Sequence, residues 1–324
     1  MLKKSSWAFC LLLVSLIFVG CKKEKIEHAS TSDHSDVKST NTYMSNLPEA
    51  NKQEIEKVFN QIISQSSQNR GVETVWGLGT DWNGNPEYGR VFRWNGTSWD
   101  EPNPAARLFS ISQGSYSGTW GLGGPHTAGA RRIFKWNGTS WDEPNPGANL
   151  YEIEAFTNLV ALGVGGSGRM YITTNGGLSW SLYHSFDPST IIHGLSVAVN
   201  NSNFAWLARD FNEVIYQSSD YATWTSRHTY GAPVNCTAAD MLSSDAYILL
   251  NNGALYRLQY VGGSVINTVN ATAPSFLDMS SKEHGVIWGI GPDRRVYKSI
   301  DEGATWNQPN PAARLDKISV GFEN

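Results

Sequence analysis

The sequence predicts an all-β protein, specifically a six-bladed β-propeller. Two series of apolar markers repeat in step along most of the chain, and each repeat holds four short β-type segments bounded by Gly, Pro and Asn. The chain of 324 residues is 40% apolar and 17% charged, with 31 Gly and 13 Trp, which excludes disordered and coiled-coil classes. A formal net charge of −4 argues against a nucleic-acid partner.

The repeat is visible directly in the sequence. Residues 91–107 read VFRWNGTSWDEPNPAAR, and residues 133–149, 42 positions later, read IFKWNGTSWDEPNPGAN. The last Trp of this unit recurs at Trp99, Trp141, Trp180 and Trp224, in a degenerate form near Ile266, and at Trp306. A second series, in short runs such as VWGLG, consists of Trp76, Trp120, Leu162, Trp206, Ile248 and Trp288. Both series keep a period of about 41 residues, which predicts six units.

Each unit is expected to form one blade of four strands. In the second unit the predicted strands are 108–113, 119–123, 131–136 and 140–141. Helical solenoids are excluded because the units are rich in β-branched and aromatic residues and have no helical periodicity. The first unit begins at Val72 without an inner strand, and the C-terminal segment 315–321 supplies one. We therefore expect this last strand to pair beside residues 73–79 and to close the ring, which removes two exposed sheet edges.

The N-terminus predicts an export signal over residues 1–20, because Lys3 and Lys4 precede an apolar run too short to span a membrane. The run ends in FVGC, which resembles the bacterial lipoprotein box. That resemblance implies cleavage before Cys21, attachment of diacylglyceryl and palmitate-type lipid to Cys21, and a lipid-anchored position in the bacterial cell envelope, at the outer membrane. The alternative is an ordinary secretory signal with an incidental Cys.

Two further segments precede the propeller. Residues 21–46 lack the apolar content to fold and are expected to act as a flexible tether. Residues 47–70 are expected to form an amphipathic helix and a connector, since apolar residues recur at helical spacing over 48–64. The helix is expected to dock onto the propeller, and the alternative is a protein-partner site at 48–64.

The repeat over residues 71–324 resembles the tectonin repeat, with the pattern W-x-x-P-x-P-x-x-x-L-x-x-I-S-V-G followed by VWGLG and V-F-R-W-N-G-x-x-W. Unit four, with Ala208 and Arg209, and unit five, without its terminal Trp, depart from that pattern. Residues 299–306, SIDEGATW, are similar to an Asp-box hairpin, and 173–180 is a variant with Asn in place of Asp. The Asp-box resemblance implies a structural role in building the blade.

Candidate binding residues lie in the loops of units six, one and two. Loops between the second and third strands are expected to share a face with the three Pro-Asn-Pro loops that connect blades. Aromatic and polar side chains in this sector suit sugar hydroxyls and ring faces, although Asp, Asn and Pro also serve ordinary turns. The candidates are Trp82, Tyr88, Trp94, Asp100, Asn103, Arg107, His126, Trp136, Asp142, Asn145, Asn149, Asn310 and Arg314.

The predicted function is noncatalytic binding of a glycan or envelope polysaccharide, because tectonin-like proteins are commonly lectins. The alternative is a protein–protein interaction module of the cell envelope. A sialidase-like glycoside hydrolase is a third candidate, but that family would need an arginine cluster and a Tyr/Glu nucleophile pair, and the chain has no matching FRIP-type segment. No catalytic residue, metal site or cofactor is predicted: there is no HExxH, and with Cys10 removed in the signal and Cys21 lipidated, no second cysteine is left to form a CxxC pair or an intrachain disulfide with Cys236.

Overall fold

The structure is a computed structural model of the whole chain. It divides into two units, residues 1–35 and 36–324, and the description below concerns the second unit alone. The described residues are 49, 53, 57, 60, 72–79, 89–114, 117–127, 130–189, 192–200, 203–210, 215–218, 224–227, 234–239, 246–261, 264–283 and 285–323. The signal, Cys21 and the tether predicted from the sequence lie outside this set.

Four positions of the predicted N-terminal helix are described. Glu49, Gln53, Lys57 and Asn60 have helical backbone and are exposed. Their spacing places them on one face of a helix. The apolar positions of that segment lie outside the described residues, so the docking of the helix stays a prediction. No helix within the described part of the chain is long and apolar enough to cross a bilayer.

All remaining regular structure is antiparallel β-sheet. The largest sheet has the strand order β24-β1-β2-β4-β5-β6-β7, with β3 paired to β2 and β8 paired to β6. Its strands are β1 (Val72–Gly79), β2 (Gly89–Trp94), β3 (Trp99–Asp100), β4 (Arg107–Gln113), β5 (Thr119–Thr127), β6 (Ala130–Trp136), β7 (Trp141–Asp142), β8 (Asn149–Leu150) and β24 (Lys317–Glu323). Strand β2 joins the two halves of this sheet through its pairing with β4.

Four smaller sheets follow along the chain. The second has the order β12-β11-β10-β9 and the others run in chain order from β13 to β16, β17 to β20 and β21 to β23. Their strands are β9 (Glu152–Ala155), β10 (Ala161–Val164), β11 (Arg169–Thr173), β12 (Ser181–Ser185), β13 (Ile192–Asn200), β14 (Asn203–Asp210), β15 (Ile215–Ser218), β16 (Trp224–Arg227), β17 (Val234–Ala239), β18 (Ala246–Leu250), β19 (Ala254–Val261), β20 (Ser264–Thr272), β21 (Asp278–Glu283), β22 (Val286–Ile290) and β23 (Val296–Ser299).

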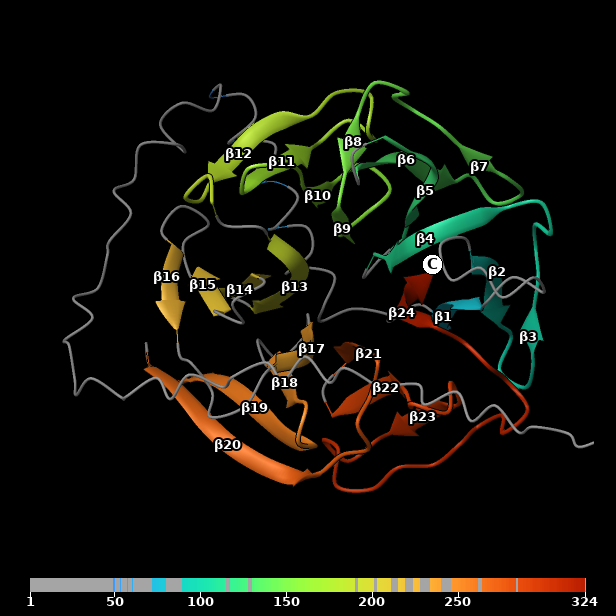
Figure 1. Ribbon diagram of the computed structural model, residues 1–324, viewed down its shortest axis with the longest axis vertical. Helices are drawn as coiled ribbons and strands as arrows, with labels where there is room; N and C mark the ends of the chain where they lie inside the picture. Colours follow the sequence, from blue (N-terminus) through green and yellow to red (C-terminus); the bar gives the residue numbers. More distant parts are fainter. Residues whose placement is uncertain are drawn as a thin grey trace, which may run out of the picture. The chain divides into compact units, whose positions relative to one another are not determined.

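The innermost strands form a closed ring. Strands β24, β4, β9, β13, β17 and β21 contact one another in this order, and β21 in turn contacts β24 (Figure 1). In each of the four smaller sheets the strands that follow the inner strand lie farther from this centre, and in the largest sheet β1 and β2 follow β24 outward, as β5 and β6 follow β4. Antiparallel sheets that radiate from a ring of inner strands make a β-propeller, as the repeats predict.

The predicted closure is present in the structure. Strand β24 pairs antiparallel with β1, with Val75 opposite Val320 and Leu78 opposite Lys317. The side chains of Leu315 and Ile318 are buried in the same cluster as Val75. The last residues of the chain therefore supply the inner strand of the sheet that begins at Val72.

The repeated Trp residues pack between neighbouring units. Trp76 of β1 contacts Trp136 and Trp141 edge-on, with ring centroids 5.5 and 5.9 Å away. Trp120 of β5 contacts Trp180 in the same way, at 6.2 Å. Trp76 and Trp120 are fully buried. The terminal Trp of one unit thus packs on the strand Trp of the unit before it, which explains why both recur with one period.

The glycines that follow the strand Trp or its equivalent make room for the leucine at the start of the inner strand of the same unit. A Cβ atom on Gly121 would lie 2.4 Å from Cδ1 of Leu108, and one on Gly163 would lie 2.1 Å from Cδ1 of Leu150. Such separations are shorter than van der Waals contact. The repeat therefore requires glycine here for close approach of a buried leucine.

Candidate functional site

The Pro-Asn-Pro loops are built by their asparagines. Oδ1 of Asn103, Asn145 and Asn310 accepts the backbone N–H two residues later, at 3.2, 3.1 and 3.1 Å. The carbonyl oxygen of the same residue accepts the N–H three residues later in all three loops. These are Asx turns, so the carboxamide oxygens hold the loop conformation.

The arginines that end two of these loops fold back onto their own backbone. Nη1 of Arg107 donates to the carbonyl oxygens of Pro104 and Ala106, at 2.6 and 2.8 Å. Nη1 of Arg314 donates to Pro311 and Ala313 in the same way, at 2.7 and 2.9 Å. Both guanidinium groups therefore stabilise the loop by bonding to its carbonyl oxygens.

Asp100 and Asp142 bond to turns outside the Pro-Asn-Pro loops. Oδ2 of Asp100 accepts from Nδ2 of Asn95, and Oδ1 of Asp142 accepts from Nδ2 of Asn137, at 2.9 and 2.8 Å. Asn95 and Asn137 each lie in the turn between the last two strands of their unit. Of the loop asparagines, Asn145 also reaches the following unit, since its Nδ2 donates to the carbonyl oxygen of Leu178 at 3.3 Å.

The remaining candidates are placed as follows. Trp136 is almost fully buried beside Trp76, and Trp94 is half-buried against Trp99 and Trp288. For His126 and Asn149 the structure describes only the backbone, in β5 and β8. Trp82 and Tyr88 lie outside the described residues.

A wide groove lies among the turns of the second and third units, and we call it the turn groove. Its volume is about 680 Å³. The residues that line it belong to four turns, 117–119, 135–138, 158–159 and 175–178, together with Arg93, Asp142, Pro144 and Glu323. Of the sequence-predicted candidates it brings together only Trp136 and Asp142.

Charged groups of both signs line the turn groove. Arg93 of β2 forms an ion pair with Glu323 of β24. Lys135 lies over the ring of Trp120, with Nζ 5.5 Å from its centroid. Burial lowers the pKa of Lys135, and the nearby Asp142 carboxylate partly offsets this effect. The groove therefore offers a cation held against an aromatic face.

Two exposed leucines accompany these charges. Leu159 is 53% exposed and Leu178 is 67% exposed, and both line the turn groove. Neither residue was singled out by the sequence, because one leucine in a turn does not disturb the repeat. The one feature of the sequence that could have identified them as candidate binding residues is an apolar side chain in an otherwise polar turn.

Two smaller grooves repeat on the loop surface. The Trp141 groove, of about 520 Å³, includes Asn103, Arg107, Phe134 and Trp141. The Trp180 groove, of about 320 Å³, includes the equivalent residues Tyr171 and Trp180. Nε1 of Trp141 and of Trp180 is buried and has no hydrogen-bond partner among the described residues. Each groove therefore holds an aromatic pair, with the indole N–H turned away from it.

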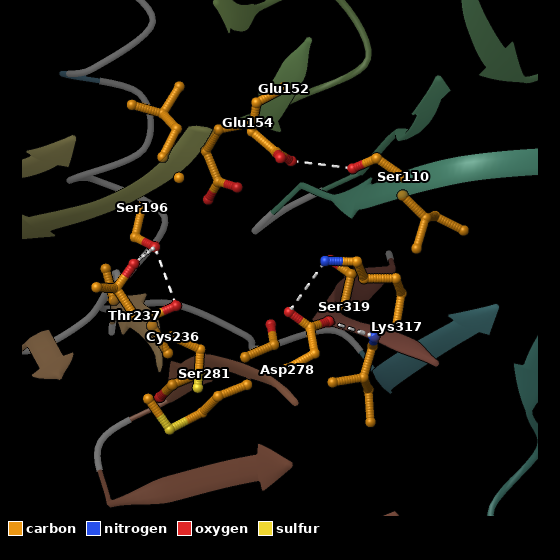
Figure 2. A pocket seen from close by; sticks show the side chains of 18 of the residues that line it. Ser110, Glu152, Glu154, Ser196, Cys236, Thr237, Asp278, Ser281, Lys317 and Ser319 are labelled. Atoms are coloured by element: carbon orange, nitrogen blue, oxygen red, sulfur yellow. Dashed lines mark hydrogen bonds and ion pairs between the residues drawn. The ribbon is translucent and has the colours of Figure 1, made fainter. Parts of the chain in front are cut away.

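The inner strands surround an axial cavity of about 120 Å³. Glu152, Glu154, Asp278, Lys282 and Lys317 are the charged residues that line it, and Figure 2 shows the labelled side chains around this space. Hydroxyls from several strands complete a predominantly polar lining. Three carboxylates and two ammonium groups thus line the cavity, so one negative charge is in excess.

Hydrogen bonds around the axial cavity follow the sequence repeat. Oγ of Ser112 accepts the N–H of Ala155, and Oδ2 of Asp278 accepts the N–H of Ile318, both at 2.8 Å. These partners are 43 and 40 residues apart, one repeat along the chain. Polar side chains on one inner strand thus replace the hydrogen bonds that the adjacent inner strand would otherwise lack.

Among the carboxylates that line the axial cavity, Glu152 has a raised pKa. Burial raises its pKa, and the negative charge of Asp278 adds to that effect, while Lys317 and a hydrogen bond from Ser110 oppose it. No described group of His, Cys, Asp or Glu side chains could hold a metal ion. Two of its carboxylates pair with lysines that also line the cavity, Glu154 with Lys282 and Asp278 with Lys317.

Comparison with known proteins gives no family assignment. No family model matches the sequence, and no curated protein matches it. Similar solved structures include YCF48 from Cyanidioschyzon merolae, with 15% identity, a TM-score of 0.45, and coverage of 75% of this chain and 88% of that chain. YCF48 bound to D1 peptide has 17% identity and a TM-score of 0.48, covering 72% and 77% of the two chains. A complex of KlAtg21 with the coiled-coil of AgAtg16 has 9% identity and a TM-score of 0.48, covering 76% and 86%.

Proposed function

We propose that this chain is a noncatalytic protein-interaction module of the cell envelope and that the turn groove is its binding surface. The observation that carries the proposal is the pair of exposed leucines, Leu159 and Leu178, in a groove that also holds fixed charges. Exposed aliphatic side chains beside polar and charged groups are typical of protein interfaces. Within the described residues, no aromatic side chain is among the large apolar groups that are exposed.

The proposal includes the architecture and the anchor expected from the sequence. A tectonin-type propeller of six blades is supported by the six inner strands of the ring and by the period of about 41 residues. Lipidation at Cys21 and residence at the outer membrane rest on the resemblance of FVGC to the lipoprotein box. Such an anchor would hold a rigid binding surface in the envelope without any chemistry at the site.

Site-specific photo-crosslinking tests the proposed surface. A photoreactive residue at position 159 or 178 of the full chain, expressed in a bacterium that exports it, is expected to capture a partner protein. Ile300 is the matched control, because it is 68% exposed and lies in the corresponding turn of the last unit. Capture from position 300 as efficient as from 178, or no capture from 159 and 178, would contradict the proposal.

Substitution provides the second arm of this test. Leu178→Asp should weaken binding of the captured partner, whereas Ile300→Asp should leave it unchanged. Both side chains are exposed, so the melting temperature of each variant should stay close to that of the parent. Equal binding by the Leu178→Asp variant and the parent would contradict the assignment of the turn groove.

Glycan binding is the second candidate, and the repeated Trp141 and Trp180 grooves favour it. Each offers an aromatic surface, which suits the ring face of a sugar. Trp141→Leu removes this aromatic surface. On a glycan array this variant should lose affinity, whereas Trp76→Phe, fully buried outside the groove, should not. An array without hits for the parent chain would exclude this candidate.

A further inference from the structure

Strand β20, Ser264–Thr272, ends its sheet with an edge unlike those of the other sheets. It is nine residues long and pairs with β19 on one side. No other strand within the described residues pairs along its outer side. It is also the strand where the sequence repeat fails, because unit five has no terminal Trp. The outer hairpin of that unit is therefore built differently from its equivalents.

The other outer strands are short, and most of them carry charge. Strands β3 and β7 have two residues each and end in Asp100 and Asp142. Strand β16 has four residues and contains Arg227, β12 has five residues, and the outer side of β23 is partly covered by a bridge between Lys298 and Asn307. Short length and charge are the ordinary means by which proteins prevent pairing at a sheet edge. The sequence of β20, SVINTVNAT, has no charged residue, no Pro and no Gly.

The register of the hairpin indicates which backbone groups are available. Val261 is opposite Ser264, so two residues connect β19 and β20. In such a hairpin the residues that flank the connection bond each other, and alternate residues beyond them direct their N–H and C=O groups outward. Those outward residues are expected to be Val265, Asn267 and Val269. Three successive outward positions are enough to template another strand.

We propose that β20 pairs antiparallel with β20 of a second copy of this chain, centred on Asn267. Because β20 has no charged residue, pairing two copies of it brings no like charges opposite each other. Centring on Asn267 sets Val265 opposite Val269 and Ile266 opposite Thr268, which are pairs of β-branched residues. The two four-stranded sheets then form one continuous sheet around a twofold axis.

Sedimentation of the full-length chain tests the association. The parent is expected to be a dimer at micromolar concentration in a Cys10→Ser, Cys21→Ser background, which removes the expected lipid. Asn267→Lys places two like charges opposite each other and should abolish the dimer. Thr225→Lys, on the outer strand β16, is the matched control and should leave the dimer intact. A monomeric parent, or a dimeric Asn267→Lys variant, overturns the proposal.

Two further variants separate pairing from folding. Asn267→Pro removes an N–H expected to face outward, a position where edge strands tolerate Pro, so it should give a monomer with the melting temperature of the parent. Asn267→Cys should form a disulfide-linked dimer under mild oxidation, because in the proposed register residue 267 of one copy lies opposite residue 267 of the other. Thr225→Cys is the control. Equal cross-linking by the two Cys variants, or a dimeric Asn267→Pro variant, overturns the proposed register.

Discussion

Nζ of Lys282 forms an ion pair with Oε1 of Glu154 across the axial cavity. Lys282 belongs to β21 and Glu154 to β9, which are not neighbours in the ring of inner strands. The side chains are only 4% and 12% exposed. Glu154 also accepts a hydrogen bond from Ser112, at 3.1 Å. One ion pair thus connects two sheets that share no hydrogen-bonded strand.

Breaking this ion pair should strongly destabilise the propeller. Lys282→Met leaves the carboxylate of Glu154 buried without its ammonium partner, and we expect a loss of about 3–5 kcal/mol. Urea denaturation measures the free energy of unfolding. The double variant Lys282→Met, Glu154→Gln should recover most of this loss, since no charge then stays unpaired. A double variant as unstable as the single one would contradict a direct interaction between the two groups.

Two carboxylates should respond to pH with opposite signs. The native pKa of Glu152 is raised above its ordinary value of 4.5, mainly by burial, so the stability it contributes is lost as the pH rises through that native pKa. The hydrogen bond from Arg90 is the main reason why the pKa of Glu101 is lowered. The stability contributed by Glu101 is therefore lost as the pH falls through its native pKa.

Gln variants of these two residues provide the measurement. Relative to the parent, Glu152→Gln should gain stability at pH 7 and lose that advantage towards pH 4. Glu101→Gln should be less stable at pH 7, and the difference should shrink as the pH falls. Thermal unfolding across this range gives both differences. Parallel pH profiles for the two variants would contradict the opposite shifts in pKa.

Removal of the closing strand should cost a large share of the stability. Deletion of residues 315–324 withdraws β24 from β1 and takes Leu315 and Ile318 out of the core. Burial of two such side chains contributes on the order of 3–6 kcal/mol, before the lost strand pairing is counted. Val72→Ala, at an exposed position of β1, is the control and should unfold like the parent. A deletion variant with an unchanged melting temperature would contradict the closure.

A methyl group on Gly123 should strain the second unit. A Cβ atom there would lie 2.7 Å from the carbonyl oxygen of Arg107, which backbone pairing holds in place. We expect Gly123→Ala to lower the free energy of unfolding by about 1–3 kcal/mol. Gly147→Ala is the matched control, because its nearest neighbour would be 3.5 Å away. Equal melting temperatures for the two variants would show that the loop can move aside.

The fold could be predicted because its packing recurs with the sequence period. Trp76 and Trp120 occupy equivalent places between repeat units, so their spacing in the sequence indicates the length of the repeated structural unit. The LxxIS pattern at the C-terminus matches the inner strand of the second unit, and this match correctly predicted the pairing of β24 with β1. Boundaries differ by a few residues: β5 continues to Thr127, whereas the pattern ends it at 123.

The candidate sites could be predicted only in part. The sequence places Asn103 and Asp100 in one loop but does not say that their side chains stabilise different turns. Leu159 and Leu178 belong to different units, and only the packing of neighbouring blades brings both to the turn groove. The composition of a loop gives residue types, whereas a groove depends on which loops become neighbours in space.

The pairing of β24 with β1 also sets the order of events during synthesis. Val72 leaves the ribosome almost the whole length of the propeller before its partner Glu323 does. Until then β1 lacks its inner neighbour and the ring cannot close. Its sequence, VETVWGLG, is one whose last six residues are buried in the folded protein. A growing chain of this kind must be shielded from its neighbours for most of its translation. Slow codons near the 3′ end of the message lengthen the time for which β1 is unpaired. They should therefore lower the yield of folded protein more than slow codons in the middle of the message.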